Sequence, residues 1–102
     1  MKKKAILEYL AHAKKRYKKE GFIIKALFGS YSRGDENEKS DVDILVEVTP
    51  EFASRYGFES FNRLKEIENE LSLAIGTKVD LADSSAMGET AKKFIIDRAV
   101  YV

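Results

Sequence analysis

The stretch that decides the fold runs from residue 29 to residue 47 and reads GSYSRGDENEKSDVDILVE. Its second half alternates carboxylates with aliphatic side chains, which predicts a strand over residues 42–48. In a strand, residues i and i+2 project from the same face, roughly 6.5–7 Å apart at Cα. Asp41 and Asp43 are therefore expected to lean toward one point, unless this D-x-D pair merely begins an exposed strand. The aliphatic residues between and after them should turn toward the core: Val42, Ile44 and Val46.

A third carboxylate, Asp80, lies in the sequence KVDLA, which predicts a short strand over residues 78–82. If this strand is the neighbour of the strand over residues 42–48, Asp80 can share a face with Asp41 and Asp43. Adjacent carboxylates raise one another's pKa unless a cation lies between them. Hard oxygen ligands suit Mg²⁺, which favours carboxylates together with substrate phosphate. Three carboxylates can serve two such ions, about 3.5–4 Å apart, in displacement at phosphorus.

The turn that precedes the acidic pair has the features of a phosphate site. The apolar run FIIKALF predicts a buried strand over residues 22–28, and Gly29 and Ser30 follow it. A short helical turn closed by Gly34 would present backbone N–H groups at a helix N-terminus. Gly29 would allow close approach of a phosphate, Ser30 would donate to it, and Arg33 could add a charge-assisted contact. The alternative is an ordinary Gly-Ser turn.

Helical periodicity surrounds these strands. Apolar side chains three or four residues apart predict an amphipathic helix over residues 3–20 and a long helix over residues 58–75. Ser84 or Ser85 is expected to cap a last helix that runs to about Arg98, followed by the tail AVYV. Helices and strands therefore alternate, which is typical of a compact α/β or α+β domain with a small sheet.

Composition narrows the class of protein. The chain has 102 residues, 44% of them hydrophobic, and no Cys. That length suits one domain over residues 1–102, and the lack of Cys excludes disulfides and thiolate catalysis. No apolar run approaches the roughly 18–20 residues of a membrane span, and the first residues lack the features of a signal peptide. We expect a soluble, cytoplasmic protein.

Charge is unevenly distributed although the formal net charge is only +1. Residues 1–20 hold eight basic and two acidic side chains, whereas residues 29–47 hold six acidic and two basic ones. The basic side chains complement the dipole of the first helix, or alternatively form a salt-sensitive nucleic-acid surface. The near-zero net charge favours the first interpretation, so direct nucleic-acid binding is not expected. The acidic cluster is either a solvated loop or the ligand of a cation.

A few further side chains invite a functional interpretation. Tyr31 lies inside the 29–47 stretch and either packs or stacks on a base. Lys78 is a candidate phosphate contact near Asp80. Four aromatic residues follow the strand over 42–48, more than a small core requires, so they form core and rim or a hydrophobic partner surface. These four are Phe52, Tyr56, Phe58 and Phe61.

At these motifs the chain resembles the minimal nucleotidyltransferase domains of the DNA polymerase beta superfamily. Their pattern is a G-S turn, a short helix ending in R-G, S-D-x-D on a strand, and a third acid on the next strand. One position departs from it, because Ser32 stands where the family often has Ala. The matching residues are Gly29, Ser30, Arg33, Gly34, Ser40, Asp41, Asp43 and Asp80.

The resemblance implies an αβαβαβ core with a mixed sheet, two Mg²⁺ ions, and transfer of NMP from ATP or another NTP with release of pyrophosphate. By position, the metal and catalytic residues are Asp41, Asp43 and Asp80, the last of which helps to activate or orient the acceptor hydroxyl. The nucleotide-binding residues are Gly29, Ser30, Arg33 and Ser40. Arg33 could equally pair with Asp35 or Glu36.

The small size resembles that of the antitoxin partners of HEPN-domain proteins. That resemblance implies a protein adenylyltransferase that transfers AMP to a tyrosine of a HEPN-type toxin. The alternative is a non-catalytic antitoxin, a binding module that neutralises its partner by stoichiometric association. Retention of all three aspartates together with the Gly-Ser turn favours the enzyme.

Overall fold

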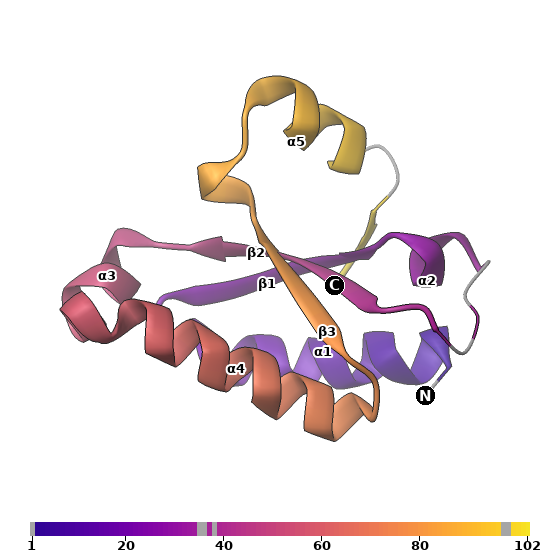
Figure 1. Ribbon diagram of the computed structural model, residues 1–102, viewed down its shortest axis with the longest axis horizontal. Helices are drawn as coiled ribbons and strands as arrows, with labels where there is room; N and C mark the ends of the chain where they lie inside the picture. Colours follow the sequence, from indigo (N-terminus) through magenta and orange to yellow (C-terminus); the bar gives the residue numbers. More distant parts are fainter. Residues whose placement is uncertain (1, 35–36, 38, 97–98) are drawn as a thin grey trace.

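The computed structural model describes residues 2–34, 37, 39–96 and 99–102 (Figure 1). Its elements follow one another as helix, strand, short helix, strand, three successive helical segments, strand, two helical segments and strand. In chain order these are α1 (Lys3–Lys18), β1 (Phe22–Phe28), α2 (Ser30–Arg33), β2 (Val42–Val48), α3 (Pro50–Tyr56), η1 (Gly57–Glu59), α4 (Ser60–Ile75), β3 (Val79–Asp83), η2 (Ser84–Ala86), α5 (Glu89–Ile96) and β4 (Val100–Tyr101).

The strands form one mixed sheet in the order β3-β2-β1-β4. β1 runs antiparallel to both β2 and β4, whereas β2 and β3 are parallel. A parallel pair needs a crossover connection, which α3, η1 and α4 provide. The expected α/β class and small mixed sheet are therefore confirmed.

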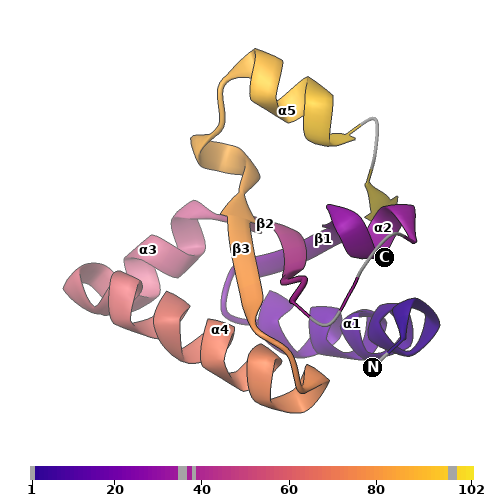
Figure 2. The same cartoon turned by 45° about the vertical axis from the view of Figure 1, so that its right-hand side comes forward.

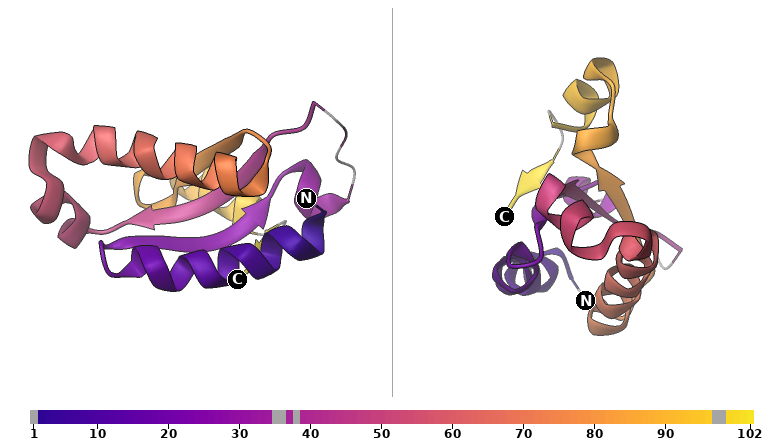
Figure 3. Two further views of the ribbon diagram at one scale, coloured as in Figure 1. Left: turned by 90° about the horizontal axis from the view of Figure 1, so that it is seen from below. Right: turned by 90° about the vertical axis from the view of Figure 1, so that its left-hand side faces the viewer.

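The helices cover the sheet unequally. α1 and α4 lie beside each other across one face, as the view from below shows (Figure 3). α5 stands on the opposite side of the sheet, apart from the other helices (Figure 2). The sheet therefore has one face sealed by two long helices and one face with far less helical cover.

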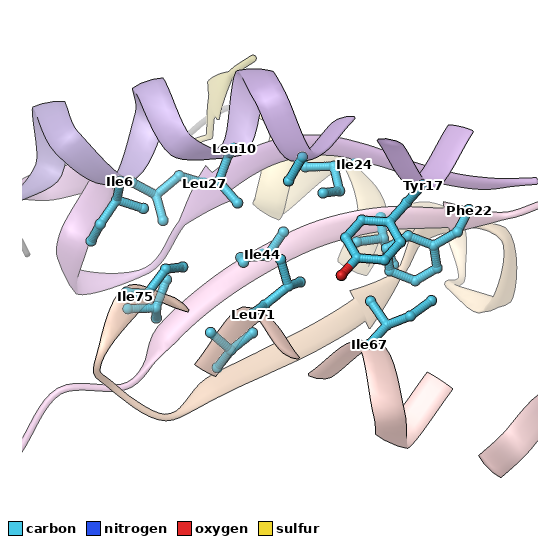
Figure 4. Packing of buried hydrophobic residues seen from close by; sticks show 14 of the residues in the cluster. Ile6, Leu10, Tyr17, Phe22, Ile24, Leu27, Ile44, Ile67, Leu71 and Ile75 are labelled. Carbon is cyan, nitrogen blue, oxygen red and sulfur yellow. The ribbon is translucent and has the colours of Figure 1, made fainter. Parts of the chain in front are cut away.

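The core fills the space between the sheet and the two long helices (Figure 4). From α1, side chains spaced three or four residues apart are buried. From β2 the alternate residues Val42, Ile44 and Val46 are buried, and Leu45 is buried as well. Tyr17 and Phe22 meet edge to face, with ring centroids 5.9 Å apart. The three strand residues that were expected to face the core, Val42, Ile44 and Val46, are fully or almost fully buried, and so are Ile6, Leu10, Ala13, Tyr17 and Val79.

The prediction for the C-terminal part was wrong in one respect. The last helix begins at Glu89 rather than at Ser84 or Ser85, because the Asp83 carboxylate accepts the Ser85 backbone N–H and closes a separate 3₁₀ turn there. The tail after this helix contains a strand, β4, which pairs with β1. The predicted helix end near Arg98 lies outside the described residues.

Two smaller differences concern the third strand and its approach. β3 covers Val79–Asp83, one residue later than predicted at both ends. α3 was not predicted, although Pro50 at its first position is a favourable start signal. Among the described residues, no helix has both the length and the apolarity needed to cross a membrane.

A polar network joins α1 to α4 at the edge of the core. The Arg63 guanidinium donates to both carboxylate oxygens of Glu20, at 2.7 and 2.8 Å, and to Glu70 at 3.1 Å. The hydroxyl of buried Tyr17 donates to Glu70, and that of Tyr56 donates to Glu20. These contacts lower the pKa of both glutamates below the ordinary 4.5, chiefly through the hydrogen bond from Arg63 for Glu20 and that from Tyr17 for Glu70. Such a depressed pKa stabilises the fold when the carboxylates are charged.

We expect Arg63→Met to lower the free energy of unfolding by about 1–3 kcal/mol near neutral pH, because Glu20 then keeps its charge without its cation. The contribution of the two glutamates is complete above pH 4.5 and is lost as the pH falls through their lower folded-state pKa values. The difference between variant and parent should therefore shrink in acid. Urea denaturation followed by circular dichroism near pH 7 and pH 3 measures it.

Arg16→Met is the matched control, because Arg16 also faces Glu70, at 3.8 Å, but its side chain is 69% exposed. Its expected cost is below about 1 kcal/mol. An Arg63→Met variant whose deficit is the same at both pH values would contradict this account of the network.

Candidate active site

The pairing of β2 with β3 places the three aspartates together. Asp43 is the direct partner of Asp80 in the parallel register, and Asp41 immediately precedes β2, beside the Val42–Val79 pair. Partners in a register project from the same face, and so do residues two apart. The predicted adjacency of the two strands is therefore correct, and the three carboxylates share the face opposite α1 and α4.

Burial and neighbouring carboxylates both raise the pKa of two of these carboxyls. Partial burial and then the charges of Asp80 and Asp41 raise the pKa of Asp43, against the opposing effect of Arg33. Partial burial and a hydrogen bond shared with Asp41 raise the pKa of Asp80, against the opposing effect of Lys78. Both shifts have the sign expected for anions crowded at one point. The cluster therefore favours the approach of a cation.

The Lys78 ammonium is a cation that faces this cluster. Its Nζ lies 3.9 Å from Asp41 Oδ2 and 4.0 Å from Asp80 Oδ1. The side chain is 70% exposed, so the contact is made at the surface. The sequence indicated Lys78 only as a phosphate contact, and its position between two aspartates required the register of the sheet.

The turn after β1 lies directly against Asp43. Gly29 precedes α2 with φ +75° and ψ −155°, a conformation essentially confined to glycine. A Cβ at this position would come within 2.2 Å of Asp43 Oδ2. Buried Ser32 donates its hydroxyl proton to the Gly29 carbonyl at 2.8 Å and so fixes the turn. The predicted short helix and its end at Gly34, in the left-handed conformation, are confirmed.

The other predicted nucleotide-binding residues lie at different distances along the chain from the Gly29 turn and have different local contacts. Ser30 is the first residue of α2, where backbone N–H groups lack helical partners. Arg33 is exposed at the end of that helix, and its charge acts on Asp43. Ser40 uses its hydroxyl locally, accepting the backbone N–H of Asn37 at 2.9 Å. The alternative partners of Arg33, Asp35 and Glu36, lie outside the described residues.

The carboxylates of Asp41, Asp43 and Asp80 suit a divalent cation that takes some of its ligands from the substrate. Within the described part of the chain, no group of three or more His, Cys, Asp or Glu side chains is arranged so that it could hold a metal ion by itself. Mg²⁺ needs only one or two carboxylates, because phosphate oxygens and water supply the rest of its shell. An ammonium already stands within 4.0 Å of two of the carboxylates, which shows that a positive charge is accommodated there.

The other aromatic side chains that the sequence singled out differ in burial. Tyr31 is only 7% exposed and belongs to the core, so packing accounts for it. Two of the four aromatic residues that follow β2 belong to the core or its edge. Phe52 is buried, and Tyr56 packs against it, with ring centroids 4.9 Å apart. Phe58 and Phe61 are 105% and 67% exposed. Those two side chains lie on η1 and α4 and offer apolar area to solvent.

Comparison with solved structures identifies the fold. A structure provisionally described as a minimal nucleotidyltransferase superposes with a TM-score of 0.75 and 20% identity, covering 100% of this chain and 97% of the other. A crystal structure of a toxin–antitoxin with AMP-PNP superposes with a TM-score of 0.66 and 22% identity, covering 90% and 70% of the two chains. The fold is that of a minimal nucleotidyltransferase.

Sequence relatives give the family. Residues 8–102 match the nucleotidyltransferase domain family. The protein adenylyltransferase MntA of Thermococcus cleftensis is 33% identical over 94% of this chain and 92% of its own length. A Methanocaldococcus jannaschii protein with the provisional name protein adenylyltransferase MJ0128 is 38% identical over 86% of each chain. The chain belongs to the nucleotidyltransferase domain family, as the resemblance of its motifs implied.

We expect Gly29→Ala to reduce stability and to displace Asp43, because the new methyl group would occupy the place of a carboxylate oxygen. The expected loss in free energy of unfolding is about 2–4 kcal/mol, from the unfavourable φ and the contact together. Urea denaturation measures the loss.

Gly57→Ala serves as the matched control. Gly57 also has a positive φ outside the left-handed helical region, and nothing lies within 4 Å of its added Cβ. Only the conformational cost, about 1–3 kcal/mol, should remain there. Equal losses in the two variants would show that the approach to Asp43 does not select glycine at position 29.

Proposed function

We propose that residues 1–102 form one Mg²⁺-dependent nucleotidyltransferase that transfers AMP from ATP to a hydroxyl group of a partner protein. The acceptor we propose is a tyrosine of a HEPN-type toxin in the cytoplasm, which would make this chain the antitoxin. The observation that supports the catalytic part is the register of Asp43 against Asp80, with Asp41 and the Gly29 turn beside them.

The proposed site residues differ in their roles according to their positions. Asp41, Asp43 and Asp80 would hold the divalent ions through their carboxylate oxygens. Gly29 and Ser30 would receive the triphosphate at the start of α2, and Arg33 would add a positive charge one turn later. Ser40 shapes the loop before Asp41, since its hydroxyl and backbone N–H are both bonded to Asn37. When bound, Mg²⁺ would neutralise charge on the phosphate oxygens.

The reaction transfers one group between two oxygens. The acceptor hydroxyl oxygen bonds to the α-phosphorus of ATP, the bond from that phosphorus to the bridging oxygen of the β-phosphate breaks, and pyrophosphate leaves. Asp80 would orient the hydroxyl and accept its proton, since its carboxylate lies in register with Asp43 at the same site. The protein's contribution is to position the reactants and to provide a fixed electrostatic environment.

Several findings support a protein as the acceptor. The relatives from Thermococcus cleftensis and Methanocaldococcus jannaschii are both named as protein adenylyltransferases. One of the structures with the same fold is that of a toxin–antitoxin with AMP-PNP. The exposed Phe58 and Phe61 side chains provide apolar area of the sort that protein interfaces bury.

We expect the parent chain, incubated with α-labelled ATP, Mg²⁺ and a co-purified HEPN-type partner, to label that partner. Asp41→Asn and Asp43→Asn should each lower the initial rate by at least about 100-fold, because they remove ligand charge from the site. Gel electrophoresis with autoradiography measures the label, and chelation of the metal should abolish it.

Glu47→Gln is the matched control, since Glu47 projects from the same face of β2 but pairs with Lys25 at 3.0 Å. Its rate should equal that of the parent. Labelling that persists in the Asp41 and Asp43 variants would refute the catalytic assignment. An Asp43→Asn chain that labels nothing but still neutralises a co-expressed toxin would instead establish the stoichiometric binding module.

A further inference from the structure

Lys78 is placed beside the carboxylate cluster by the backbone. The Val42 backbone N–H donates to the Lys78 carbonyl at 2.9 Å, which fixes residue 78 next to the start of β2. The following residue, Val79, is fully buried and pairs with Val42. The proximity of the ammonium to Asp41 and Asp80 therefore follows from the register of two strands and not only from the rotamer of an exposed side chain.

The position of Lys78 coincides with the place where charge must be neutralised. Its Nζ lies about equally far from the two carboxylates, 3.9 Å from Asp41 and 4.0 Å from Asp80. These carboxylates share a hydrogen bond that raises the pKa of Asp80, and the charge of Lys78 opposes that rise. Lys78 therefore offsets the repulsion that the parallel pairing of β2 and β3 creates.

A divalent ion and the ammonium cannot both occupy the space between Asp41 and Asp80 without strong repulsion. The side chain of Lys78 has room to leave. It is 70% exposed, and it lines an open hollow of about 370 Å³ beside Gly76 and Thr77. Displacement of Lys78 would thus require the loss of two surface ion pairs but no rearrangement of the core.

We propose that Lys78 is the stand-in cation of the metal-free site, and that a divalent ion must displace its ammonium to bind Asp41 and Asp80. This inference rests on the proposed function, because it assumes that these aspartates are metal ligands. Lys78 acts through the carboxylates and is a positioning residue. Its charge holds Asp41 and Asp80 together while no metal is bound and lowers the affinity of the free protein for metal.

The test is a titration of the free protein with Mn²⁺, followed by the electron paramagnetic resonance signal of the unbound ion, without nucleotide. Lys78→Met removes the competing charge, so Mn²⁺ should bind about three- to tenfold more tightly than in the parent. Lys78→Arg keeps the charge and should bind Mn²⁺ as the parent does. Circular dichroism melting curves check that each variant is folded.

Lys25→Met controls for the loss of one positive charge elsewhere. Lys25 pairs with Glu47, which lies four residues beyond Asp43 on β2, roughly 13 Å away along the strand and beyond one Debye length at physiological salt. Its Mn²⁺ affinity should match that of the parent. Unchanged or weaker Mn²⁺ binding by Lys78→Met would overturn the inference, as would tighter binding by Lys78→Arg.

Asp41→Asn in the same titration separates the two proposals, because Asp41 is one of the two carboxylates that Lys78 faces. If it binds Mn²⁺ as tightly as the parent, the aspartates are not the metal site and the proposed function fails. If it weakens binding while Lys78→Met leaves the affinity unchanged, the metal site stands and only the role of Lys78 is wrong.

Discussion

The parallel pairing of β2 with β3 is the constraint on which the rest of the structure depends. It aligns Asp43 with Asp80 and brings Asp41 and Lys78 to the same end of the two strands. Carboxylates so placed lose solvent and repel one another, and the pKa of both Asp43 and Asp80 is raised, first by burial and then by the neighbouring aspartates. Other contacts in the fold must therefore stabilise the close approach of these carboxylates.

That stabilisation comes from the opposite face of the same strands. Val42, Ile44 and Val79 alternate with the aspartates and are fully buried against α1 and α4. A shift of one residue in the register would expose these side chains and bury the carboxylates, so the core holds the site in place. The hydrogen bond from Tyr17 to Glu70, within the network around Arg63, then joins the two helices that cover this core.

Much of this arrangement was predictable, and the two exceptions have separate causes. The strand over residues 22–28, the strand over residues 42–48 and the short helix after Gly29 followed from periodicity and from turn residues. The start of the last helix was misplaced, because Asp83 closes a separate turn with Ser85 that local helix signals do not anticipate. The pairing of the tail with β1 was missed because two residues carry little periodicity of their own.

The sequence by itself determined that the aspartates lie on or directly before strands and share one face of each strand, because the alternation of carboxylates with aliphatic residues is local information. Only the tertiary structure decided that Lys78 stands between Asp41 and Asp80 and that Gly29 must lack a side chain beside Asp43. Those relations join segments far apart along the chain. They depend on strand register and close packing, which no stretch of sequence contains on its own.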